Sequence, residues 1–96
     1  MKIVFYDELE NTGTFVVGCL DDDVALSVVE RAKRCGTVYR AEFVCGVSRF
    51  GDCAIVRVVC SRNSSTDDFV EDLREGLKLD DIMLVEKQKI KDWYGI

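Results

Sequence analysis

The sequence predicts one α+β domain over residues 1–96, built as a ferredoxin-like β-α-β-β-α-β plait with an extra N-terminal strand. Two observations lead to this prediction. Apolar residues alternate with a period of two in the segments expected to be strands, and they recur every three or four residues in the segments expected to be helices. The resulting plan places two helices on one face of a mainly antiparallel sheet, and a length of 96 residues allows one modest core.

The chain opens with an expected β-hairpin followed by a helix. β-branched and aromatic residues fill segments 2–6 and 14–20, and the Asn-Thr-Gly sequence at 11–13 is a turn signal. Three consecutive aspartates at 21–23 then offer capping oxygens and negative charge for a helix start. This helix is expected to end with Gly36 in a left-handed cap.

Two longer segments are expected to form a second hairpin. Segment 37–50 alternates between two sides, as a strand with one solvated face requires. One side holds Tyr39, Ala41, Phe43, Cys45 and Val47, and the other holds Arg40 and Glu42. Segment 53–60 is apolar on both faces apart from Arg57, which is typical of a central strand. A turn at 50–52 would let the two strands pair.

A second helix and an edge strand complete the expected fold. Ser64, Ser65 or Thr66 can cap the helix, and Gly76 is expected to end it. Its inward side is formed by Phe69, Val70, Leu73 and Leu77. Segment 82–90 is then expected to be a strand, with Ile82, Leu84 and Ile90 on one side and Met83, Val85, Lys87 and Lys89 on the other. Lysines on a strand are typical of a protected sheet edge.

The clearest candidate for a functional surface is the outer side of the second expected helix. This helix has two basic residues, Arg74 and Lys78. Its carboxylates are Asp67, Asp68, Glu71, Asp72 and Glu75. Several lie four residues apart, where like charges cost a helix about 0.2–0.5 kcal/mol per pair. An ordinary solvated helix face is the alternative interpretation. The tolerated repulsion favours a surface that binds a protein partner with a basic surface.

Charge and hydrophobicity limit the classes of partner. The chain has 13 basic and 18 acidic residues, a net charge of −5 and a pI near 4.6. Because phosphates must be neutralised by Lys and Arg, this balance disfavours direct binding to nucleic acid or to an anionic membrane. No apolar run approaches the roughly 18 residues that span a bilayer, and the first residues do not form a signal peptide. We therefore expect a cytoplasmic protein, in the host cytoplasm if a phage encodes it.

The side chains that most enzymes and metal sites use are scarce. The chain has no histidine, so it cannot form Ser-His or Cys-His nucleophilic pairs by itself. The closest two of its five cysteines, Cys53 and Cys60, are seven residues apart, unlike the paired ligands of a zinc site. The seven glycines do not cluster into a phosphate-binding loop. We therefore expect no catalytic residue, no metal site and no cofactor.

Two alternatives to the acidic surface follow from other parts of the chain. The segment from Gly18 to Asp23 leads into a helix N-terminus that could hold a polar ligand, which would make the chain a small-molecule sensor domain or a small enzyme. The helix dipole could also activate Cys19, although burial of this thiol and simple capping by the aspartates explain the same residues without a ligand. The other alternative is a structural subunit that forms a homodimer through a sheet edge.

In size, charge and plan the chain resembles the small acidic phage inhibitors, among them anti-CRISPR proteins, that block the nucleic-acid channels of host defence complexes. The resemblance carries over no functional residue. It implies a noncatalytic protein-binding module that inhibits a nucleic-acid-processing enzyme or complex by acting as a nucleic-acid mimic, in effect a phosphate decoy. The acidic side of the second helix would then contact the basic surface of that partner.

Overall fold

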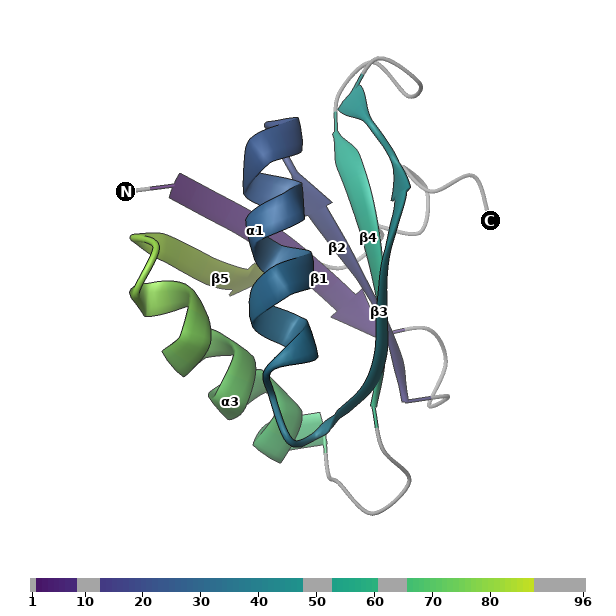
Figure 1. Ribbon diagram of the computed structural model, residues 1–96, viewed down its shortest axis with the longest axis vertical. Coiled ribbons are helices and arrows are strands. Elements are labelled where there is room, and N and C mark those ends of the chain that lie inside the picture. Colours follow the sequence, from purple (N-terminus) through teal and green to yellow (C-terminus); the bar gives the residue numbers. More distant parts are fainter. Residues whose placement is uncertain (1, 9–12, 48–52, 61–65, 88–96) are drawn as a thin grey trace.

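The computed structural model describes residues 2–8, 13–47, 53–60 and 66–87, and its elements follow the order expected from the sequence (Figure 1). The N-terminal half contains β1 (Lys2–Glu8), β2 (Thr14–Cys19), α1 (Asp22–Lys33) and β3 (Val38–Cys45). The C-terminal half contains β4 (Ala54–Cys60), α3 (Thr66–Lys78) and β5 (Ile82–Glu86). The predicted α+β class with two helices is therefore confirmed.

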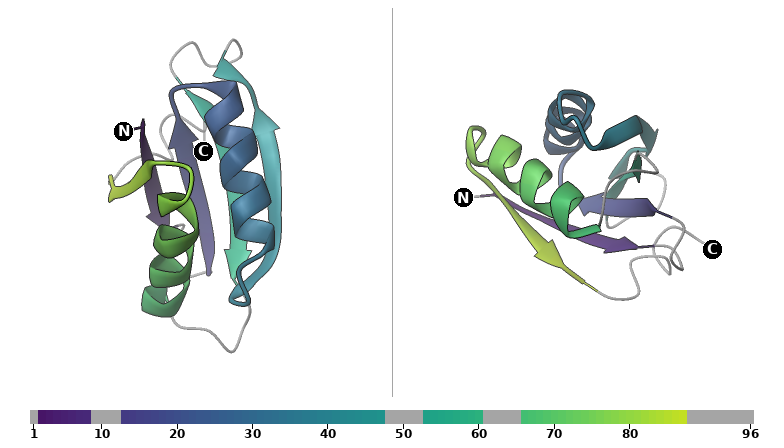
Figure 2. Two further views of the ribbon diagram at one scale, coloured as in Figure 1. Left: turned by 60° about the vertical axis from the view of Figure 1, so that its left-hand side comes forward. Right: turned by 90° about the horizontal axis from the view of Figure 1, so that it is seen from below.

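The strands form one mixed sheet in the order β3-β4-β2-β1-β5. Neighbouring strands are antiparallel except for β1 and β5, which run parallel. Both helices cover the same face of the sheet, α1 over β3 and β4 and α3 beside β5 (Figure 2). An uninterrupted plait would place β5 directly beside β2, but β1 lies between them, because β1 pairs with β2 as an antiparallel hairpin and fills that position.

The main core lies between the helices and the sheet. The ring of Phe15 on β2 stacks on the ring of Phe69 on α3, with centroids 4.4 Å apart and an interplanar angle of 30°. Leu73 and Leu77 are fully buried in the same cluster, and Val70 lies at its border. These contacts confirm the predicted inward side of the second helix. They also determine which side of α3 faces solvent, because a helix packed along one side exposes the opposite one.

A second apolar cluster lies on the sheet face opposite the helices. It contains Val16, Cys45, Cys53 and Ile55, with Phe5 packed against it. Because successive residues of a strand point to opposite faces, Val16 faces away from the helices while its neighbours Phe15 and Val17 face toward them. The central strands β2 and β4 are thus buried on both faces, as predicted for segment 53–60.

Strand β3 departs from the predicted alternation because it contains two irregularities in register. They fall between Val38 and Arg40 and between Phe43 and Cys45, so that Tyr39 and Val44 are extra residues opposite β4. Each extra residue reverses the side to which the following residues point. Tyr39 is therefore 79% exposed, whereas Ala41 and Cys45 are buried on opposite faces of the sheet. The prediction that one side holds Tyr39, Ala41, Phe43, Cys45 and Val47 is wrong.

Both helices end differently from the prediction, although the predicted start of α1 is confirmed. The Asp21 side chain caps α1 by accepting a hydrogen bond of 2.7 Å from the backbone N–H of Asp23. At the other end the C-cap is Arg34 in a right-handed conformation, so Gly36 does not act as a left-handed cap. Helix α3 continues through Gly76 to Lys78, and Asp81 adopts a φ of 56° in the turn that follows.

Strand β5 is an edge strand, as predicted, but its described extent is Ile82–Glu86. Ile82 and Leu84 are buried, while Met83 is exposed. The backbone N–H of Lys87 donates a 2.9 Å hydrogen bond to the carbonyl of Tyr6, which extends the pairing with β1 by one residue. The expected turn at 50–52, the expected strand residues Lys89 and Ile90, and the cap candidates Ser64 and Ser65 lie outside the described residues.

An ion pair joins the C-terminal end of α1 to the turn between α3 and β5. The Arg31 guanidinium donates from Nε to Asp80 Oδ2 at 2.7 Å and from Nη2 to Asp80 Oδ1 at 3.2 Å. The hydrogen bonds from Arg31 lower the pKa of the Asp80 carboxyl below its ordinary value of 3.8. This two-bond geometry connects segments that are distant in sequence, so the pair helps to position α3 against α1.

Removing the Phe69 ring should destabilise the protein strongly, because it leaves a cavity between α3 and Phe15. We expect Phe69→Ala to lower the free energy of unfolding by about 3–5 kcal/mol, measured by urea denaturation. The control is Leu79→Ala, at a side chain that is 76% exposed, where we expect a change within about 0.5 kcal/mol. Equal effects of the two substitutions would contradict the proposed role of the ring stack.

Stability should fall in acid partly through Asp80. Because its pKa is lower in the folded state, the unfolded state binds more protons, and the stabilisation is complete above the ordinary carboxyl pKa. It is lost as the pH falls through the lowered folded value. We expect Asp80→Asn to be less stable than the wild type at neutral pH but to lose less stability on acidification, measured as unfolding free energy against pH. Arg31→Gln should show the same change, and the double variant should show no further loss. Additive effects would contradict the pairing.

Candidate functional site

The outer side of α3 is the acidic face, which we define as Asp67, Asp68, Glu71, Asp72 and Glu75. All five residues are exposed, as the sequence predicts. At 3.6 residues per turn they span an arc of about 140° on the helix surface and a length of about 12 Å along its axis. No residue of the acidic face contributes to the core, because the opposite arc of α3 carries the buried residues. The acidic face is therefore exposed to solvent.

Two cations of the same helix neutralise part of the acidic face. Arg74 Nη1 lies 3.7 Å from Glu71 Oε1, and Lys78 Nζ lies 3.0 Å from Glu75 Oε1. Both pairs join residues three positions apart, and such exposed pairs are weak because water screens them. Helix α3 therefore keeps an excess of negative charge, as expected from its five acidic and two basic residues.

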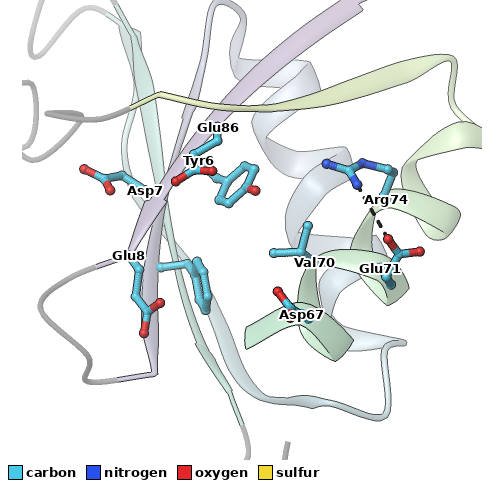
Figure 3. A pocket seen from close by; sticks show the side chains of 9 residues that line it. Tyr6, Asp7, Glu8, Asp67, Val70, Glu71, Arg74 and Glu86 are labelled. Atoms are coloured by element: carbon cyan, nitrogen blue, oxygen red, sulfur yellow. Dashed lines mark ion pairs between the residues drawn. The ribbon is translucent and has the colours of Figure 1, made fainter. Parts of the chain in front are cut away.

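One end of the acidic face borders a pocket of about 420 Å³ between the start of α3 and the ends of β1 and β5 (Figure 3). Its lining residues come from the sheet and the helix, and they are Tyr6, Asp7, Glu8, Phe15, Asp67, Val70, Glu71, Arg74 and Glu86. Asp67 and Glu71 thus belong both to the acidic face and to the pocket. Acidic residues of three elements line the pocket, together with two aromatic residues.

The sequence analysis missed this pocket because its residues are far apart along the chain. Parallel pairing of β1 with β5 sets Tyr6 directly beside Glu86. The packing of α3 then brings Arg74 and Asp67 to the other side of the same space (Figure 3). The only local signal was the Asp7-Glu8 pair at the end of a predicted strand, which an ordinary turn would also explain.

Tyr6 is the central polar group of the pocket. Its side chain is mostly buried, with the residue 9% exposed, and its hydroxyl points across the pocket toward α3 (Figure 3). Burial raises the pKa of Tyr6 most, and the negative charge of Glu86 raises it further, while Arg74 acts in the opposite direction. The hydroxyl therefore stays protonated at neutral pH, so it can donate a hydrogen bond but is not a phenolate nucleophile.

The segment from Gly18 to Asp23, considered above as a ligand-binding loop, lies at the junction of β2 and α1. Gly18 and Cys19 belong to β2, and only Leu20 and Asp21 connect this strand to α1. Asp21 caps the helix, and Asp22 Oδ1 accepts a 2.9 Å hydrogen bond from the backbone N–H of Val47. These two aspartates therefore have structural roles at the start of α1.

The cysteines have the environment of structural thiols. None of the five forms a disulfide, and Cys19 is fully buried. Burial raises the pKa of Cys19 to about 12, and the nearby Cys53 and Asp21 act in the same direction. Burial likewise raises the pKa of Cys60 to about 11 and, to a smaller extent, that of Cys35. Because the thiolate is the reactive form, these three thiols are poor nucleophiles at neutral pH.

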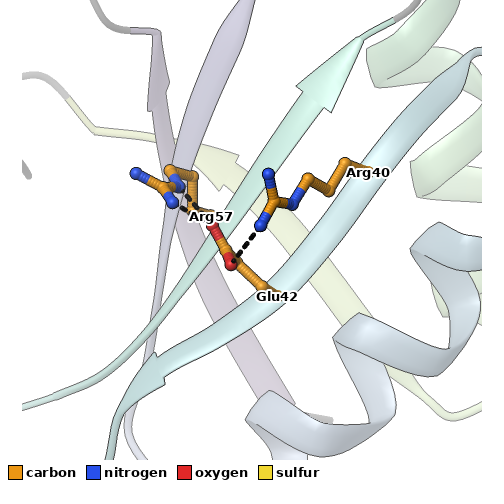
Figure 4. A network of polar contacts seen from close by, with 3 residues as sticks. All are labelled: Arg40, Glu42 and Arg57. Atoms are coloured by element: carbon orange, nitrogen blue, oxygen red, sulfur yellow. Dashed lines mark hydrogen bonds and ion pairs between the residues drawn. The ribbon is translucent and has the colours of Figure 1, made fainter.

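A polar network on the sheet face away from the helices joins β3 to β4 (Figure 4). Glu42 Oε1 accepts a 2.6 Å hydrogen bond from Arg57 Nε and a second bond from Arg57 Nη2, while Glu42 Oε2 lies 3.4 Å from Arg40 Nη2. The bonds from Arg57 lower the pKa of Glu42. The network places opposite charges on directly paired positions, which is a common way to stabilise neighbouring strands.

Within the described ranges, no group of three or more His, Cys, Asp or Glu side chains has an arrangement that could hold a metal ion. The same part of the chain contains no helix that is long and apolar enough to cross a membrane. Comparison with known proteins gives no match to a family model, to a curated protein or to a solved structure. Function is therefore inferred from the arrangement of the residues alone.

Cys19 should resist alkylation in the folded protein, because its thiol is buried and its pKa is about 12. We expect iodoacetamide at about pH 8 to leave Cys19 unmodified in buffer and to modify it in concentrated urea, measured by peptide mass spectrometry. A Leu79→Cys variant provides an exposed thiol on the same fold as a control and should react at once. Equal labelling rates at Cys19 and at the introduced cysteine in buffer would contradict this prediction.

Proposed function

We propose that this chain is a noncatalytic protein-binding module whose acidic face docks on a basic surface of another protein. The observation that carries this proposal is the separation of roles on α3. One side of the helix supplies buried core residues, while the other presents five exposed carboxylates. Net charge that is concentrated on one surface steers a partner of opposite charge and orients it.

The charge arrangement of α3 supports a role beyond solubility. Like charges lie four residues apart at three positions along the helix, in the pairs 67/71, 68/72 and 71/75. Each such pair costs about 0.2–0.5 kcal/mol, and interspersed lysines would remove the cost. Asp7, Glu8 and Glu86 add negative charge beside the start of the helix. A basic partner would relieve the repulsion that the isolated protein retains.

The most concrete form of this function is inhibition of a nucleic-acid-processing enzyme or complex in the cytoplasm. The acidic face has the sign of charge that a nucleic-acid backbone carries, so it would compete for the same basic groove as a phosphate decoy. Neither nucleic acid nor a membrane is a direct ligand in this proposal.

We also propose that the fold is a ferredoxin-like plait in which β1 lies between two strands of the plait. The order β3-β4-β2 within the sheet supports this proposal, because a plait has the same order for these three strands.

Homodimerisation through a sheet edge has less support than docking by the acidic face. The outer strands are β3 and β5. The register of β3 is interrupted twice, and such bulges disturb the regular row of hydrogen-bonding groups that a second strand would need. The described part of β5 has only five residues, and it ends at Glu86 with Lys87 directly after it. Short and charged strands are typical of protected edges.

Reversing charge on the acidic face should abolish partner binding without unfolding the protein. Tagged wild-type protein and Asp68→Lys/Asp72→Lys would be used to capture partners from the native host. We expect the wild type alone to retain a partner whose nucleic-acid binding it inhibits. With the purified partner, the variant should bind at least about tenfold more weakly, and raising the salt concentration should weaken wild-type binding.

The matched control is Asp23→Lys/Glu30→Lys, which makes the same change in net charge on the exposed side of α1. Circular dichroism would verify that all three proteins are folded. Because the control changes net charge without touching α3, it should retain most of the binding. If the α3 variant and the wild type bind the partner with equal affinity, the acidic face has no part in the function. If the α3 variant and the α1 control lose equal amounts of affinity, only the overall charge of the protein matters.

A further inference from the structure

We propose that the pocket between α3 and the ends of β1 and β5 receives one arginine side chain of the basic partner. This inference rests on the proposed docking function and names the contact that would anchor it. The pocket and the acidic face are continuous, because Asp67 and Glu71 belong to both. A partner that covers the acidic face could therefore place one of its arginine side chains in the pocket as part of the same interface.

The volume of the pocket can accommodate one long side chain. Its volume of about 420 Å³ lies at the small end of the range of roughly 300–1,000 Å³ that is typical of ligand sites. Phe15 and Val70 supply apolar wall. The wall is held in place by core packing, since the Phe15 ring stacks on Phe69 and lies 6.2 Å from the Tyr6 ring. A rigid wall lets a side chain bind without reorganising the protein.

The charge of the pocket selects a cation. Carboxylates reach it from β1, from α3 and from β5. Among the described residues that line it, Arg74 is the only cation, and Glu71 already lies 3.7 Å from its guanidinium. Glu86, Arg74 and, more weakly, Asp67 act on the Tyr6 hydroxyl electrostatically, so two negative charges and one positive charge lie close to the same point. Negative charge is therefore in excess around a buried polar group.

The arrangement favours a guanidinium over a metal ion or an ammonium group. The described carboxylates are not grouped closely enough to coordinate a metal ion. The pocket also has aromatic and apolar lining residues, which a planar guanidinium can contact with its face while its edge donates to carboxylates. A lysine ammonium is compact and strongly hydrated, so it would lose more solvation on entering the pocket.

The test uses N-acetyl-arginine amide as the probe, titrated into the isotope-labelled full chain and followed by NMR. We expect saturable shifts of the backbone amides of Tyr6, Val70 and Arg74. The neutral analogue N-acetyl-citrulline amide has the same shape and should give none, and N-acetyl-lysine amide should bind more weakly. Glu86→Gln should weaken arginine binding about three- to fivefold, while Glu30→Gln on α1 should leave it unchanged.

Several outcomes would overturn the proposal. Binding of the citrulline or lysine analogue as tight as that of the arginine analogue would refute selection of a guanidinium, and shifts confined to residues outside the pocket would refute the location. Should Glu86→Gln fail to fold, Glu8→Gln at the end of β1 serves as the second pocket variant. If the arginine analogue does not bind but Asp68→Lys/Asp72→Lys still abolishes capture, this inference fails and docking by the acidic face stands. If the arginine analogue binds in the pocket but Asp68→Lys/Asp72→Lys captures the partner as well as the wild type does, docking by the acidic face fails and the arginine pocket stands.

Discussion

The packing of α3 on the sheet through the stacked rings of Phe15 and Phe69 is the contact on which the rest of the structure depends. Once Phe69 and the leucines of its side are buried, the rotation of the helix about its axis is determined. The acidic face then points to solvent, and the flank that carries Val70 and Arg74 borders the pocket. One apolar contact thus orients both the charged surface and the cavity beside it.

The position of β1 is the second constraint on the site. Because β1 lies between β2 and β5, its end is held beside the end of β5 by parallel pairing, and Tyr6 is set next to Glu86. The pocket therefore depends on β1 lying between β2 and β5. The Arg31–Asp80 ion pair is a further constraint, because it connects the turn before β5 to α1.

The chemistry of the remaining polar groups leads to binding as the proposed activity. Asp21 and Asp22 are used by backbone N–H groups at the start of α1, and the Cys19 thiol is too deeply buried to react. Glu42 is engaged by two arginines of the sheet. The carboxylates of α3, by contrast, are exposed and have no role in the core, and the pairs that Glu71 and Glu75 form with cations of the same helix are weak. They are the groups whose interactions a partner would change most.

The sequence by itself determined the succession of strands and helices, the inward side of α3 and the exposure of its five carboxylates, because these properties depend on periodicity over neighbouring residues. Tertiary structure alone decided three others. The bulges of β3 place Tyr39 in solvent, β1 lies between β2 and β5, and the pairing of β1 with β5 creates the pocket at Tyr6. The bulges are features of the register between β3 and β4, and the other two properties depend on which strands become neighbours. Local patterns of hydrophobicity encode neither.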